Sequence, residues 1–134
     1  MSVELRQIPV DTETFEIWGD GAIVGFISWR RSTEWLSRGH VSYEVAEAHR
    51  CKGYAKEALR QLLEMVADRW PEVIDQVQIC CAVDNVASRL VIEHCGGERD
   101  LSRGKIFQDP TDGKWTISYW VPVKKVLDDA EQKD

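Results

Sequence analysis

The pattern of apolar and polar positions predicts strands in the first third of the chain. Residues 15–18 alternate in the order Phe-Glu-Ile-Trp, which suits a half-buried strand. Gly19-Asp20-Gly21 follows as a turn signal, and residues 22–29 then form a more apolar run, so the two segments predict a β-hairpin. Residues 4–8 are compatible with a short edge strand, and residues 40–45 form the third clear strand.

A helix is the most strongly predicted element of the chain. Between Tyr54 and Trp70 the apolar residues recur at the spacing that places them on one helix face, and Pro71 follows as a stop signal. Those positions are Ala55, Ala58, Leu59, Leu62, Leu63, Val66 and Trp70. This face is expected to pack on a sheet.

The second half of the chain predicts one more helix between strands. Residues 77–83 are apolar at alternate positions and nearly so at the others, as in a central strand covered on both sides. Asn85 or Asp84 can cap a helix that Gly96-Gly97 ends, with Gly96 suited to a left-handed cap. Residues 101–107 and 115–123 then predict a closing hairpin, with Trp115 and the later odd-numbered apolar residues on one face.

These elements predict one mixed α/β domain. The order is strand, strand, strand, helix, strand, helix, strand, strand. The strands at residues 40–45 and 77–83 are joined through a helix and should be parallel, with a right-handed crossover. The domain is expected to span residues 1–123, and the charged residues 124–134 are expected to form a frayed tail.

The composition and charge of the chain limit the functions and partners that it can have. The chain has 134 residues, 43% hydrophobic and 30% charged, which describes a single soluble domain. It contains neither an apolar run of membrane-spanning length nor a signal-peptide core near Met1, so a cytoplasmic location and no membrane partner are expected. The net charge of −6 argues against nucleic acid as a partner and would attract a cationic amine.

The cysteines give no metal-binding pattern. Cys51, Cys80, Cys81 and Cys95 lack CxxC spacing, and the adjacent pair should point to opposite faces of a strand. We therefore expect reduced, mostly buried thiols and no metal.

A candidate anion site lies between the third strand and the first helix. In Arg50-x-x-Gly53-x-Ala55 a small-residue turn would expose the unpaired N–H groups of a helix N-terminus, where the helix dipole favours a phosphate. Arg50, Lys52 and Lys56 add cationic donors. The segment lacks the Walker and the dinucleotide fingerprints, and an ordinary turn with basic residues in solvent remains the alternative.

This segment resembles motif A of the GCN5-related N-acetyltransferase (GNAT) superfamily. A second segment, Asp84-Asn85-x-Ala87-Ser88 with Ile92-Glu93 and Gly96-Gly97 after it, resembles the strand-to-helix segment that follows motif A in that superfamily. The resemblance covers residues 15–123. It is closest to an uncharacterised branch marked by Gly39-His40-x-x-Tyr43 before motif A, by Gly96-Gly97 and by a final Tyr119-Trp120 strand.

The resemblance implies the GNAT fold, in which the two parallel strands splay apart, and acetyl-CoA as co-substrate. It implies cofactor binding by Val45, Arg50, Cys51, Lys52, Gly53, Tyr54, Ala55, Lys56, Asn85 and Ser88. Plain helix capping is the alternative for Asn85 and Ser88.

The catalytic residues are less determined. Glu44 and His40 are candidate bases that should share one strand face, with a purely structural role as the alternative for each. Tyr119, Cys95 and His94 are the candidate acids. Tyr43 would either stack on substrate or fill the core. Family members often carry the acid tyrosine on the second helix, and the matching position here is Ile92. The alternatives are therefore a catalytically degenerate CoA-binding sensor or scaffold, or a protein whose helix turn is merely structural.

One departure from the family concerns the N-terminus. The family usually has a first strand and two helices before the hairpin, whereas only about fifteen residues precede it here. Those helices normally help to shape the acceptor site. A homodimer partner is one way to replace them, and the acceptor itself is expected to be a small-molecule or peptide amine.

Overall fold

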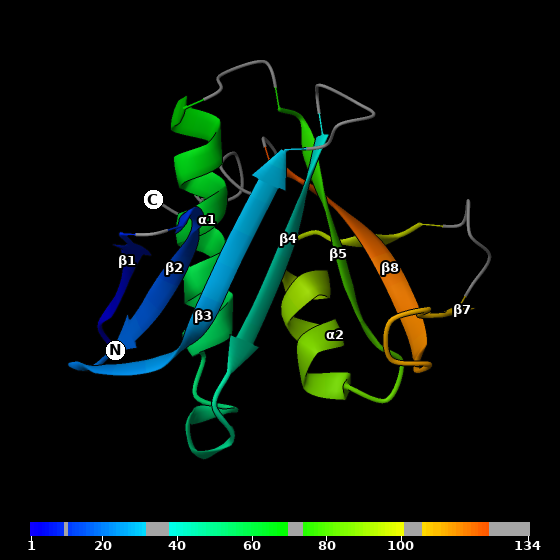
Figure 1. Cartoon of the computed structure of the whole chain (residues 1–134), viewed down its shortest axis with the longest axis horizontal. Helices are drawn as coiled ribbons and strands as arrows, with labels where there is room; N and C mark the ends of the chain where they lie inside the picture. The colour runs from blue at the N-terminus through cyan, green and yellow to red at the C-terminus, as the bar shows by residue number, and fades with distance from the viewer. Residues whose placement is uncertain (10, 32–37, 70–73, 101–105, 124–134) are drawn as a thin grey trace.

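The computed structural model of the chain describes residues 1–9, 11–31, 38–69, 74–100 and 106–123. Its eight-stranded sheet has the order β1-β2-β3-β4-β5-β8-β6, with β7 paired to β8. The strands are β1 (Val3–Ile8), β2 (Asp11–Gly19), β3 (Ala22–Arg31), β4 (Arg38–Val45), β5 (Gln76–Ala82), β6 (Glu98–Arg99), β7 (Phe107–Gln108) and β8 (Trp115–Pro122). The helices are η1 (Glu47–His49), α1 (Tyr54–Arg69) and α2 (Val86–His94). The predicted mixed α/β sheet is confirmed (Figure 1).

The N-terminal hairpin forms as predicted, with longer strands. β2 and β3 pair antiparallel, and Asp20 and Gly21 both have positive φ in the turn between them. The edge strand is also present as β1, paired antiparallel to β2, so four strands precede α1 where the predicted order had three. Among the described residues no helix precedes β2, and Figure 1 shows α1 on one side of the sheet and no helix in front of β2, β3 and β4.

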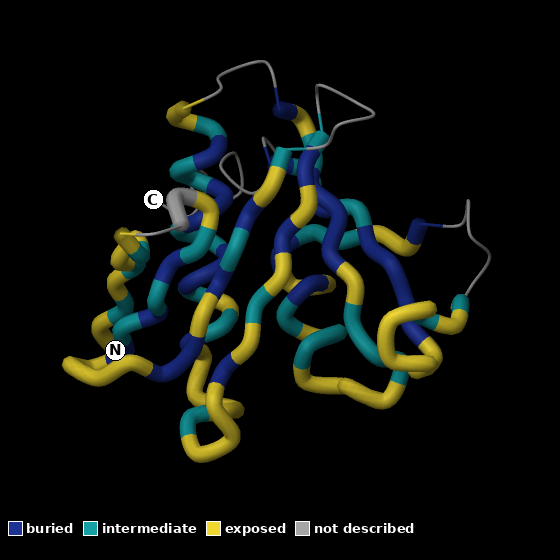
Figure 2. The backbone as a smooth tube through the Cα atoms, in the orientation of Figure 1, coloured by how far each residue is buried: buried dark blue, intermediate teal, exposed yellow. Residues whose placement is uncertain are grey.

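The helix α1 carries the predicted apolar face. Ala58, Leu59, Leu62, Leu63 and Val66 have no measurable exposure and pack into the core beneath the sheet (Figure 2). Full burial of a Leu or Val side chain stabilises the fold by about 1.5–3 kcal/mol, so this face anchors α1 firmly. Trp70, which the pattern assigned to the same face, lies outside the described residues.

The parallel strands β4 and β5 pair over only part of their length. Arg38 to Val41 pair with Gln76 to Ile79, and beyond this point β4 continues to Val45 and β5 to Ala82 without pairing to one another. Figure 1 shows the two strands diverging, with α2 lying in the gap. The splay that the family resemblance implied is therefore present.

The C-terminal part differs in detail from the prediction. β8 pairs antiparallel with β5 and also with the short strands β6 and β7, so the closing hairpin is reduced to the β7–β8 turn in the part of the chain that the structure describes. Ile117, Tyr119 and Val121 are buried as predicted, but Trp115, expected on the same face, is 57% exposed at the start of β8.

The cysteines are free, as expected, but they are not mostly buried. Cys95 is buried and Cys81 half-buried, whereas Cys51 and Cys80 are exposed. The expectation was wrong for Cys51 because it lies in the exposed loop before α1, and for Cys80 because it points to the opposite sheet face from Cys81.

None of the described helices is long and apolar enough to cross a membrane. The Trp35-Leu36 segment and the tail at residues 124–134 lie outside the described residues, so the expectations for them are not tested.

Candidate cofactor cleft

The loop between β4 and α1 presents a cluster of backbone N–H groups. Arg50 is extended, Cys51 has φ 62° and Gly53 has φ 88°, so the chain turns through two left-handed residues before the helix begins. The first helical hydrogen bond runs from the Glu57 N–H to the Gly53 carbonyl at 3.2 Å. The N–H groups of Tyr54, Ala55 and Lys56 therefore have no acceptor within the helix, and they form a cradle for an anion.

Gly53 leaves the loop open on its outer side. A Cβ placed on Gly53 would meet only the end of the Met1 side chain, at 3.6 Å, so the space there is not filled by backbone. A non-glycine residue is disfavoured at φ 88°, because the left-handed conformation brings Cβ close to the following carbonyl oxygen. Both observations fit a backbone that approaches a phosphate closely.

The loop forms one end of a cleft of about 590 Å³ between the diverging end of β4, the start of α1 and α2. Nine of the ten predicted cofactor-binding residues line it: Val45, Arg50, Cys51, Gly53, Tyr54, Ala55, Lys56, Asn85 and Ser88. Lys52, the tenth, is exposed and does not line the cleft. Residues of both sequence segments that predicted a cofactor site thus line the same cleft.

The edge of β4 offers backbone groups to the cleft. The Ala46 N–H donates to the Val24 carbonyl at 2.8 Å, so Ala46, directly after β4, forms a hydrogen-bonded pair with Val24 of β3. In an antiparallel pair of strands, hydrogen-bonded pairs alternate with pairs whose backbone groups point away from the partner strand. The backbone N–H and C=O of Tyr43 and Val45 therefore point toward the gap beside β5. The Val45 carbonyl accepts a hydrogen bond from Arg50 Nε at 2.9 Å, which ties the loop to the strand end.

The first turn of α2 forms the opposite wall. Asn85 caps the helix, since its Oδ1 accepts the Ser88 N–H at 3.1 Å, and this leaves the Nδ2 group as its side-chain donor. Ser88 Oγ lies 2.7 Å from the Tyr43 hydroxyl across the cleft. The capping role of Asn85 is therefore real, and its amide remains placed to bind a ligand.

Burial raises the pKa values of two side chains near this wall. Desolvation raises the pKa of Tyr43 to about 12, and the hydrogen bond to Ser88 only partly opposes this shift. Desolvation also raises the pKa of Cys81, which again shares a hydrogen bond with Ser88. Both groups are consequently neutral near pH 7.

A second network holds the N-terminal side of the cleft. The Tyr54 hydroxyl donates to Asp20 Oδ2 at 2.6 Å, and the Ser2 N–H donates to Asp20 Oδ1 at 2.9 Å. The Tyr54 hydrogen bond is the main cause that lowers the pKa of Asp20, and it raises the pKa of Tyr54 in turn. The network fixes the β2–β3 turn against the first turn of α1.

The three predicted catalytic residues lie in three different places. Glu44 is exposed and lines the cleft. His40 shares its strand face, as predicted, but lines a separate groove. Tyr119 is only 1% exposed, and its hydroxyl accepts a hydrogen bond from Arg89 Nε at 3.4 Å, so it lines neither hollow.

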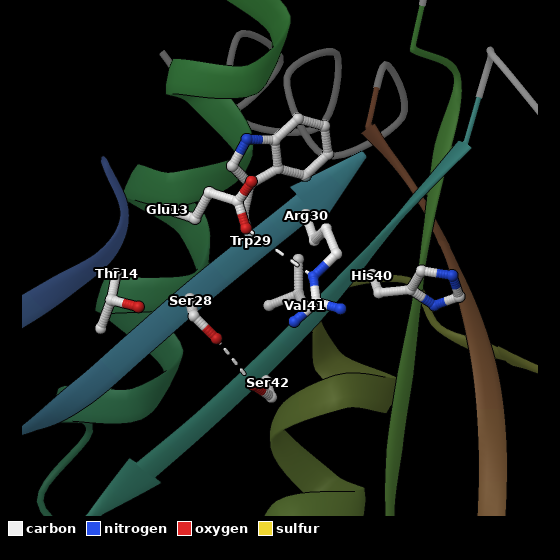
Figure 3. A pocket seen from close by; sticks show the side chains of 8 residues that line it. All are labelled: Glu13, Thr14, Ser28, Trp29, Arg30, His40, Val41 and Ser42. Carbon is white, nitrogen blue, oxygen red and sulfur yellow. Dashed lines mark hydrogen bonds and ion pairs between the residues drawn. The ribbon is translucent and has the colours of Figure 1, made fainter. Parts of the chain in front are cut away.

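The separate groove, of about 320 Å³, lies over β2, β3 and β4 (Figure 3). Ser28 and Ser42 hydrogen-bond across the strands at 2.8 Å, and Arg30 pairs with Glu13 at 3.7 Å. Because residues two apart on a strand share a face, the exposed column of His40, Ser42 and Glu44 leads from this groove to the cofactor cleft.

Sequence reasoning missed several residues of the cleft wall. His49, Ala87, Leu90 and Val91 line it without having been predicted, and the hydroxyl of Tyr43 was not assigned to it. Leu90 is an exposed apolar residue on α2, where Ile92 alone is buried, and only the assembled cleft gives its exposure a meaning. Among the described residues no cluster of potential ligands forms a metal site.

A comparison with known protein families identifies the class of protein to which the chain belongs. A sequence model of the acetyltransferase (GNAT) domain matches residues 6–98, more than half of the chain. The chain therefore belongs to the GNAT family of acetyltransferases. The family assignment confirms the superfamily resemblance and the acetyltransferase class, whereas the particular branch stays a prediction.

Solved structures share the fold at low sequence identity. An acetyltransferase of the GNAT family from Bacillus anthracis is 19% identical, with a TM-score of 0.69 over 84% of this chain and 68% of that chain. The microcin C7 self-immunity acetyltransferase MccE, solved with acetyl-CoA and AMP, is 20% identical, with a TM-score of 0.67 over 81% and 59%. Spermidine N-acetyltransferase from Vibrio cholerae, solved with CoA and spermine, is 14% identical, with a TM-score of 0.68 over 85% and 67%.

These alignments span about three-fifths to two-thirds of the length of those structures. No curated protein sequence matches the chain. At these identities the solved structures establish the fold alone.

Proposed function

We propose that this protein transfers the acetyl group of acetyl-CoA directly to a primary amine of a small molecule or peptide. The observation that carries the proposal is the cleft, in which the free N–H groups of Tyr54, Ala55 and Lys56 meet the backbone edge of Tyr43 and Val45. The first set suits the pyrophosphate of CoA, and the second suits the amides of its pantetheine arm.

The free energy of micromolar binding requires contacts from both halves of the cleft. Micromolar affinity corresponds to about −8 kcal/mol. A charge at a helix N-terminus contributes about 0.3–2 kcal/mol, so the loop is insufficient even with hydrogen bonds from cationic side chains added. Contacts along Val45, Asn85 and the apolar wall of α2, which line the same cleft, would contribute the remainder.

The amine is proposed to reach the cleft from the helix-free sheet face. Four residues of extended strand span about 13 Å, so His40 and Glu44 are too far apart to contact the same nitrogen. Glu44 lines the cofactor cleft and is therefore the proposed base, acting directly or through water. His40 lines the groove and is proposed to contact a more distant part of the acceptor. A cytoplasmic location and a homodimer remain predictions.

The proposal is tested by release of CoA thiol with spermidine and with a peptide bearing a free amine, and by mass spectrometry of the acetylated product. Glu44→Gln should lower kcat by about 10²-fold, the lower end of general base catalysis, with acetyl-CoA affinity retained. His40→Gln should alter KM for the acceptor more than kcat. Equal activity of wild type and Glu44→Gln would contradict the assigned base.

A CoA-binding sensor or scaffold without turnover is the second candidate. It is favoured by Ile92, which occupies the position of the family tyrosine and is fully buried. Tight CoA binding with no acetylated product from any amine would support this candidate.

A further inference from the structure

The hydroxyl of Tyr43 lies at the closed end of the cofactor cleft. β4 and β5 stop pairing at Val41 and Ile79, and Tyr43 is two residues beyond, where the gap between the strands begins. The anion cradle at Cys51 to Lys56 lies along the same cleft. A CoA molecule whose phosphates occupy the cradle and whose arm follows the β4 edge would therefore bring its sulfur toward Tyr43.

The hydroxyl is held in a fixed position. Ser88 Oγ lies 2.7 Å from it, and the Ser88 backbone is in turn fixed by the Asn85 cap. The Tyr43 hydroxyl also lies 3.4 Å from the Ser88 carbonyl, a long hydrogen bond in which it is the donor. When the Ser88 hydroxyl donates to Tyr43, the tyrosine proton can turn from this carbonyl to a stronger, charged acceptor in the cleft.

The other candidate acids are less well placed. Ile92 cannot donate a proton, and Tyr119 is 1% exposed with its hydroxyl beside Arg89. Cys95 is buried, and His94 does not line the cleft. Tyr43 and Ser88 thus supply the hydroxyl groups of the cleft wall where β4 faces α2.

We propose that Tyr43, positioned by Ser88, donates a hydrogen bond to the CoA sulfur as the thiolate leaves. This inference rests on the proposed acetyl transfer. In that step the amine nitrogen bonds to the carbonyl carbon, the C–S bond breaks, and its electron pair goes to sulfur. The Tyr43 O–H stabilises the resulting thiolate, and the proton lost by the amine finally neutralises it through solvent.

The acidities decide between a hydrogen bond and a full proton transfer. The pKa of Tyr43 is about 12, whereas an ordinary thiol has a pKa of about 8.5. Transfer of the tyrosine proton to the thiolate would therefore be unfavourable, so Tyr43 keeps its proton. The chemistry differs in this respect from catalysis by a matched general acid.

Tyr43→Phe tests the assignment, because it removes the hydroxyl and keeps the ring. The ultraviolet absorbance of the thiolate reports the thiol pKa of CoA bound to the whole protein. A hydrogen bond from Tyr43 predicts that this pKa rises by about one unit or more in Tyr43→Phe, the size expected for a hydrogen bond to a charged group. With an amine acceptor, kcat should fall by about 10- to 100-fold, and CoA affinity should change little.

Ser88 is tested as a positioning residue. Ser88→Ala should raise the pKa of the bound thiol part of the way toward its value in Tyr43→Phe, and Ser88→Thr, which restores a hydroxyl, should reverse the change. A purely structural role for Ser88 would alter thermal stability without moving the thiol pKa.

The outcomes separate this inference from the proposed function. Wild type that binds CoA, with the same thiol pKa and kcat in Tyr43→Phe, overturns the inference and leaves acetyl transfer intact. A larger loss of kcat in Tyr119→Phe than in Tyr43→Phe also overturns it. Wild type that does not bind CoA overturns both.

Discussion

The cofactor cleft has two ends that are built differently. At the loop end the binding groups belong to the backbone: N–H groups of Tyr54, Ala55 and Lys56, exposed by the left-handed turn at Cys51 and Gly53. At the closed end they are side chains, Tyr43 from β4 and Ser88 from α2, which are 45 residues apart in the sequence.

The difference explains what each end depends on. The loop end depends on a local backbone conformation, which the left-handed turn at Cys51 and Gly53 provides. The closed end needs the sheet and α2 to bring separate residues together, so it depends on the packing of α2 against the sheet. Substitutions should therefore act on binding at the loop end and on chemistry at the closed end.

The largest effect is expected at the loop end. Gly53→Val introduces a branched side chain at φ 88° and covers the cradle, so acetyl-CoA affinity should fall by at least about 100-fold, a loss near 3 kcal/mol. Calorimetric titration measures the change. Gly113→Val is the matched control, because Gly113 also has positive φ but lies in the β7–β8 turn. An equal loss of affinity in both variants would show that strain, not the cradle, is responsible.

Asn85→Ala is expected to have the next largest effect. Removal of an amide that contacts the cofactor should weaken binding by about 1–3 kcal/mol. The variant also loses the helix cap, for about 1 kcal/mol of stability. Asn85→Asp keeps a capping oxygen and loses the Nδ2 donor, so it should weaken binding without the loss of thermal stability. Full affinity in Asn85→Asp would identify Asn85 as a cap only.

Arg50→Ala should have a smaller effect on affinity. The substitution removes the hydrogen bond to the Val45 carbonyl and one positive charge beside the cradle, and affinity should fall by about tenfold. Arg50→Lys keeps the charge and loses the Nε geometry. Titrations at two salt concentrations separate the two contributions, since only the charge contribution weakens as salt rises. Unchanged affinity in Arg50→Ala would contradict both.

The smallest effect concerns the network at Asp20. Because its pKa is lowered in the fold, Asp20 contributes stability above its unfolded pKa of about 3.9, and this contribution is lost as pH falls through the lower folded value. The raised pKa of Tyr54 contributes stability below about pH 10, which is lost as pH rises through the folded value. Tyr54→Phe should therefore lower Tm most between about pH 4 and pH 10. A Tm difference that is independent of pH would contradict this assignment.

The sequence predicted the loop end of the cleft better than the closed end. Gly53 and the apolar face of α1 lie within one continuous segment, and their local conformations follow from residue type and spacing. The contact between Tyr43 and Ser88 depends on the point where β4 stops pairing with β5, and no single segment encodes that point. Tyr119 shows the reverse case: its residue type suggested chemistry, whereas the alternation of β8, also predicted from the sequence, places it in the core.

The most direct test of the central claim is calorimetric titration of the whole chain with acetyl-CoA, then CoA, then ATP. The cleft predicts binding of acetyl-CoA and CoA with roughly micromolar affinity, and much weaker binding of ATP, which has phosphates but no pantetheine arm. ATP binding as tight as that of CoA would show that only the cradle at Gly53 recognises the ligand. Absence of binding by both CoA compounds would contradict the assignment of the cleft.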